Sequence, residues 1–63
     1  MDQQEQKLIS DLMIKLKEAE QRSGPRDRDA EELIADALLR QPAAPYYMAQ
    51  VILVQDHAIQ AQY

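Results

Sequence analysis

The stretch that decides the fold covers residues 45–54 and reads Pro-Tyr-Tyr-Met-Ala-Gln-Val-Ile-Leu-Val. Proline suits the first turn of a helix, because its fixed φ angle fits and its missing N–H would be unpaired there. The stretch holds one amide, Gln50, and no charge occurs before Asp56. A helix that is apolar nearly all round must be covered on more than one side. The sequence therefore predicts a central helix over about residues 45–62.

An amphipathic helix is expected before it, over residues 2–23. Asp2 and Glu5 have the three-residue spacing of a capping box. At the other end, Gly24 can take the left-handed conformation that commonly closes a helix, and Pro25 cannot continue the turn. We therefore expect Gly24 to form the left-handed cap of this helix.

A second amphipathic helix is expected over residues 29–41, with Asp29 as its N-cap and Pro42 as its stop. Because the connectors between the three helices are short, consecutive helices should pack as neighbours. The predicted fold is an all-α, three-helix module that forms a single domain over residues 1–63. One apolar stripe from each helix should make the core, which we expect to contain Leu8, Leu12, Leu16, Leu33, Ile34, Ala37, Leu38, Val51 and Val54.

The chain is too short to form a large core. A domain of about 60 residues buries only about 60% of the surface that its unfolded chain exposes, so disulfides, a metal or a partner usually help. The sequence has no cysteine and one histidine, His57, which argues against disulfides and a zinc site. We therefore expect the central helix to be shared in a homo-oligomer, with an interface formed by Tyr46, Tyr47, Met48, Ile52, Gln55 and Ile59.

Charge argues against two classes of partner. The net charge is −4 with His57 neutral, whereas nucleic acids and anionic membranes attract basic surfaces. No apolar run reaches the ~20 residues that span a bilayer. The first six residues are polar and acidic, without the features of a secretory signal. We expect a cytoplasmic protein that binds neither nucleic acid nor membrane.

No group of residues suggests catalysis or a cofactor. His57 belongs to no nucleophile–base grouping visible in the sequence. The acids between Asp27 and Asp36 lack the alternating oxygen ligands and central glycine of a calcium loop. We therefore expect no enzymatic activity, no cofactor and no metal. Two interpretations stay open: an oligomerisation or protein-docking module, and a ligand-binding sensor module whose pocket is lined by Tyr46, Tyr47 and Met48.

The chain also resembles a known family. Residues 40–47 read Arg-Gln-Pro-Ala-Ala-Pro-Tyr-Tyr, residues 50–55 read Gln-Val-Ile-Leu-Val-Gln, and a leucine-rich pattern opens the chain from Glu5 to Leu16. Together these segments resemble the N-terminal part of an uncharacterised bacterial family often labelled periplasmic ligand-binding sensor protein. The resemblance covers nearly the whole chain and includes no catalytic motif. It implies a longer protein, with a helical continuation after Tyr63, and its label suggests the periplasm.

Overall fold

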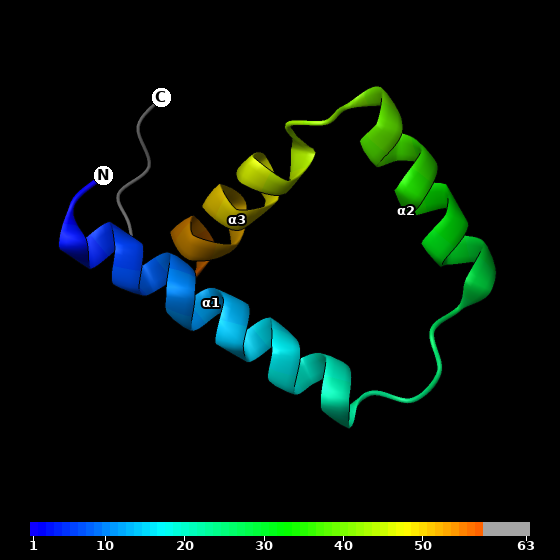
Figure 1. The fold of residues 1–63 in the computed structure, drawn as a ribbon, viewed down its shortest axis with the longest axis horizontal. Coiled ribbons are helices and arrows are strands. Elements are labelled where there is room, and N and C mark those ends of the chain that lie inside the picture. Colours follow the sequence, from blue (N-terminus) through cyan, green and yellow to red (C-terminus); the bar gives the residue numbers. More distant parts are fainter. Residues whose placement is uncertain (58–63) are drawn as a thin grey trace.

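The computed structural model describes residues 1–57, which form three α-helices. Helix α1 spans Gln3–Arg22, α2 spans Arg28–Arg40 and α3 spans Ala44–Gln55. Figure 1 shows them as the three sides of an open triangle, in which α3 crosses the N-terminal half of α1 and α2 stands apart. The prediction of an all-α, three-helix fold is confirmed.

Both α1 and α2 begin at an aspartate side chain. The Oδ1 atom of Asp2 accepts a hydrogen bond from the Glu5 N–H at 2.7 Å, as the capping-box spacing predicts. The Oδ1 atom of Asp27 accepts one from the Ala30 N–H at 3.1 Å. Each bond satisfies an N–H group that the first helical turn leaves unpaired. The prediction of Asp29 as the cap of α2 was therefore wrong, because α2 begins earlier and places Asp29 inside its first turn.

Ser23, and not Gly24, closes α1. The N–H and the hydroxyl of Ser23 both donate to the Ala19 carbonyl oxygen, at 3.0 and 2.7 Å. Ser23 is itself extended, and Gly24 does not have a positive φ angle. The expected left-handed glycine was wrong. A residue that precedes a proline is driven towards extended conformations, and Pro25 imposes this restriction on Gly24.

Helix α3 begins within one residue of its predicted start and ends earlier than expected. His57 has a φ angle of 58° and donates from its N–H to the Val54 carbonyl oxygen at 2.9 Å. Histidine is among the residues enriched in this left-handed region, where helices commonly close. The expected continuation towards residue 62 was wrong, since α3 ends at Gln55. The predicted interface residue Ile59 lies outside the described residues.

The core lies where α3 crosses α1. Leu12 and Leu53 are only 6% and 5% exposed there, and Ala44 is also buried, at the other end of α3. Among the described helices, the substantial contact is that between α1 and α3. Leu12 was a predicted core residue, whereas Leu53 and Ala44 were not. The predicted core residues Leu8, Leu38 and Val54 are half-buried.

Five other predicted core residues are exposed, because α2 does not pack against α1 or α3. The contact of α3 with the N-terminal half of α1 fixes one corner of the triangle, and the connectors at residues 23–27 and 41–43 form the other two. A helix of 13 residues is about 20 Å long, so α2 bridges these two corners as a separate side. The exposed residues are Leu16, Leu33, Ile34, Ala37 and Val51.

Candidate functional site

An exposed apolar surface lies on α3. Val51 and Gln55 each lie two residues from the buried Leu53, so the helical repeat of 3.6 residues places them on the opposite side. Tyr47 and Met48 extend this side towards the start of the helix, because residues three and four apart are neighbours on a helix. We call these four residues, Tyr47, Met48, Val51 and Gln55, the outer face of α3. All four are exposed, and Val51 is 52% exposed.

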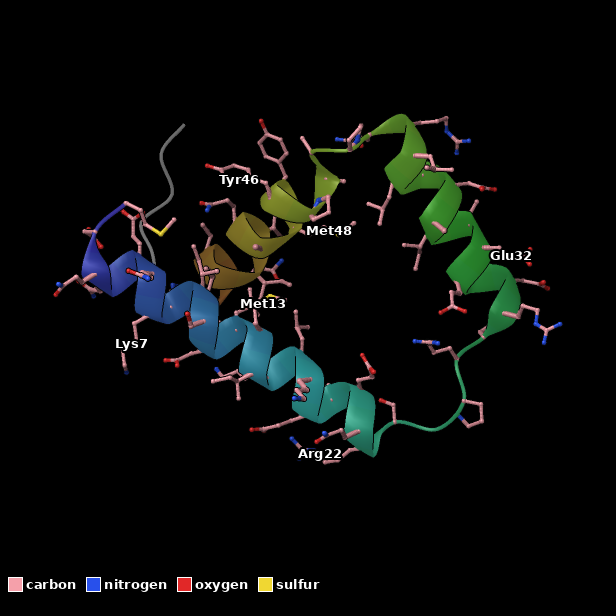
Figure 2. All side chains as sticks on the ribbon, in the orientation of Figure 1. Lys7, Met13, Arg22, Glu32, Tyr46 and Met48 are labelled. Atoms are coloured by element: carbon pink, nitrogen blue, oxygen red, sulfur yellow. The ribbon has the colours of Figure 1, made fainter. Side chains whose placement is uncertain are left out.

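Two aromatic rings mark the start of α3. The ring centroids of Tyr46 and Tyr47 lie 5.1 Å apart, with the ring planes at 86°, which is an edge-to-face arrangement. Figure 2 shows Tyr46 pointing away from α2, whereas Met48 lies on the side of α3 that faces α2. Both tyrosines are more than half exposed. Tyrosine is common at interfaces, because it buries an apolar ring and keeps its hydroxyl group hydrated.

The predicted interface is partly exposed in the single chain. Tyr46, Tyr47, Met48 and Gln55 are exposed, whereas Ile52 is half-buried. Sequence reasoning assigned Val51 to the core and therefore missed it as a surface residue. Helix α3 has no charged residue that would identify its solvent side. Its apolar residues look alike in sequence, and only the contact with α1 reveals that Leu53 is the one that is buried there.

A second apolar surface lies on α2. Its members recur at i, i+3, i+4, i+7 and i+8, which places them on one side of the helix. Leu33 is 68% exposed and Ile34 is 55% exposed. Leu39, which is 81% exposed, falls on the opposite side of the helix. We call the stripe the apolar face of α2; it contains Ala30, Leu33, Ile34, Ala37 and Leu38.

Charge differs sharply between the two helices that carry these faces. Helix α2 has four acidic and two arginine residues, whereas α3 has no charged residue. An ion pair joins Arg26 and Glu31 at 2.7 Å, but both side chains are at least half exposed. Exposed pairs contribute about 0–1 kcal/mol, because water screens them. The faces therefore differ in electrostatic character: the surroundings of the α2 face are acidic, and those of the α3 face are neutral.

A groove of about 690 Å³ also lies between α1 and α3. Tyr46, Tyr47 and Met48 do not line it, so it differs from the ligand pocket that the sequence suggested. Four of its lining residues are apolar and four are charged. The lining consists of Leu8, Asp11, Leu12, Ile14, Lys15, Glu18, Leu53 and Asp56.

Two further properties concern metals and membranes. Across residues 1–57, no three His, Cys, Asp or Glu side chains gather closely enough to hold a metal ion. Within the same range, no helix combines the length and the apolar character that crossing a bilayer requires.

Three curated relatives of similar sequence come from Buchnera aphidicola. The chain is 48% identical over 60 residues to an uncharacterized protein of the subspecies Baizongia pistaciae, covering 95% of this chain and 22% of that protein. It is 46% identical over 59 residues to an uncharacterized protein of the subspecies Acyrthosiphon pisum, covering 94% of this chain and 25% of that protein. An uncharacterized protein of the subspecies Schizaphis graminum is 41% identical over 59 residues, covering 94% of this chain and 25% of that protein.

These comparisons establish family membership and leave the activity open. The chain spans about a quarter of the length of the curated relatives that it matches. No solved structure matches it. None of the matching descriptions mentions a sensor, a ligand or the periplasm, so that part of the expected resemblance gains no support. The model of the family described as "Uncharacterized protein conserved in bacteria (DUF2076)" matches residues 1–63, and the chain therefore belongs to this bacterial family.

Proposed function

We propose that this chain is a non-enzymatic self-association module that docks to a second copy through the outer face of α3. One observation carries the proposal: an uncharged helix exposes Tyr47, Met48 and Val51 on the side opposite its contact with α1. Burial of apolar surface is worth roughly 25 cal/mol per Å². Covering this face with a partner would therefore stabilise the fold as well as join two chains.

The loose packing of the single chain supports this proposal. Its radius of gyration is 13.6 Å, whereas a compact domain of this length has a value of about 11 Å. Within the described residues, only Leu12, Ala44 and Leu53 are buried apolar residues. So few buried side chains give a small chain little stability of its own. A partner that covers the exposed apolar surface would supply what the single chain lacks.

Sedimentation of the chain at micromolar concentration tests the proposal. We expect a species of at least twice the 7.3 kDa mass of one chain. Val51→Asp should return the species to the mass of one chain, because an unpaired charge in an apolar contact is strongly disfavoured. Val51 suits this test better than Ile52, which is already half-buried inside the chain.

Leu39→Asp is the matched control, since Leu39 is 81% exposed and lies away from both apolar faces. It introduces the same charge into the same chain and should leave the oligomer intact. A wild-type chain that is folded and sediments as one chain would refute the proposal. Equal dissociation by both variants would show that charge alone, and not the outer face of α3, controls association.

A second candidate function is small-molecule sensing, and the groove between α1 and α3 favours it. Its volume of about 690 Å³ falls within the range of roughly 300–1,000 Å³ that is typical of ligand pockets. Three carboxylates and one lysine line it, which would suit a cationic ligand. A thermal-shift screen with organic cations tests this function, because a ligand that binds the folded state raises the melting temperature. An unchanged melting temperature across millimolar concentrations would leave self-association as the proposed function.

A further inference from the structure

We infer that two copies of this chain form a symmetric dimer in which the apolar face of α2 of each copy packs on the outer face of α3 of the other. The inference rests on the proposed self-association, and it identifies the surface that covers α3. Three properties carry it: the exposed area of the chain, the position of α2 and the distribution of charge.

The chain exposes more surface area than a compact monomer of its mass. The chain exposes 5987 Å², whereas a folded monomer of 7.3 kDa is expected to expose about 4,200 Å². The excess is roughly 1,800 Å², about twice the ~800 Å² that each partner contributes to an interface of standard size. Covering one face of one short helix would leave much of this excess in water. An interface of this size has room for a second apolar face, and α2 offers one.

The position of α2 explains why a second copy, and not the same chain, provides the partner surface. Leu33 and Ile34 on α2 and Met48 and Val51 on α3 are all about half exposed or more. In the single chain, the contact between α1 and α3 and the two connectors hold α2 away as the third side of the triangle. In a second copy, α2 is not joined by these connectors to the α3 of the first copy, so the two faces can approach each other. A two-fold axis makes the interface reciprocal. When α2 of one copy packs on α3 of the other, the second α2 packs on the first α3 in the same way.

Charge favours pairing α2 with α3. Pairing α2 with α2 would bring Asp29 and Glu31, the two acids that border the apolar face, close to the same two acids of the other copy. Like charges brought together across an interface disfavour such a pairing. Helix α3 has no charged residue, so pairing it with α2 avoids this repulsion. It also covers both exposed apolar faces, whereas pairing α3 with α3 would leave the α2 face in water.

Cysteine cross-linking tests the pairing, because the natural chain has no cysteine. Chains with Leu33→Cys are mixed with heavy-isotope-labelled chains with Val51→Cys, oxidised mildly and weighed intact by mass spectrometry. A disulfide forms when the two Cα atoms approach within about 7 Å. We expect the mixed, half-labelled dimer to be several-fold more abundant than in a control that carries Leu39→Cys in place of Leu33→Cys. That control places the thiol on the opposite side of α2.

Three other outcomes would overturn the inference, and they are distinguishable. Dominant linking of Val51→Cys chains to one another would replace this pairing by an α3–α3 contact and leave self-association standing. A disulfide within one chain of the double variant Leu33→Cys/Val51→Cys would show that α2 closes on its own α3. Reduced variants and wild type that all sediment as folded single chains would refute the proposed self-association itself.

Discussion

Replacing Leu53 by alanine tests the contact that holds the fold together. Leu53 is 5% exposed and lies beside Leu8 and Leu12 of α1, with which it lines the groove between α1 and α3. The substitution removes three carbon atoms from a nearly dry site, worth about 0.8 kcal/mol each. Leu→Ala changes in cores cost about 2–5 kcal/mol in total, depending on the cavity left behind. Because Leu53 also lines the open groove, the new space joins an existing one, and we expect a cost of about 2.5–3 kcal/mol.

This cost is large relative to the whole stability of the chain. At roughly 0.05–0.15 kcal/mol per residue, a chain of 63 residues has an unfolding free energy of about 3–9 kcal/mol. Urea denaturation followed by far-ultraviolet circular dichroism measures the change, with the chain concentration held fixed because the proposed association would contribute to stability. Leu39→Ala is the control, since its side chain is 81% exposed and such changes usually stay within about 0.5 kcal/mol. Equal costs for the two variants would refute the assignment of the core to this crossing.

Four other predictions follow from local structure and charge. Gly24→Ala should stabilise the chain by about 0.4–1 kcal/mol, because Gly24 has no positive φ and no atom lies near its added Cβ; a lower urea midpoint would contradict this. Asp27→Ala should lower the free energy of unfolding by about 1 kcal/mol, because it removes the hydrogen bond from the Ala30 N–H. Asp27→Asn keeps an acceptor oxygen and should retain most of this stability. His57→Gly should raise stability by up to about 1 kcal/mol, since glycine accepts the left-handed φ of 58° without strain, and His57→Ala should not. Mixed single- and double-stranded nucleic acid should show no mobility shift at about 0.15 M salt, because the chain is acidic overall; saturable binding at low micromolar protein would contradict this.

The sequence determined the elements and most of their boundaries. Periodic apolar residues established three helices, and Pro25, Pro42 and Pro45 placed the ends of α1 and α2 and the start of α3 within a few residues, whereas the end of α3 was missed. These signals are local, because a cap or a proline acts on the turn next to it. The errors at the helix ends were also local. Asp27 and Asp29 are both competent caps, and the enrichment of histidine in the left-handed region is too weak to predict that His57 adopts it just after the end of α3.

The tertiary structure alone decided which apolar stripe is buried. Val51 and Leu53 are equally apolar, and no charged residue on α3 distinguishes their sides. Leu33 on α2 likewise belongs to a stripe that the periodicity alone would assign to a core. Periodicity shows that a helix has an apolar side, but it does not show what covers that side. Here the crossing of α3 over α1 buries Leu53, and the two connectors hold α2 away from both helices, which leaves Leu33 and Val51 exposed.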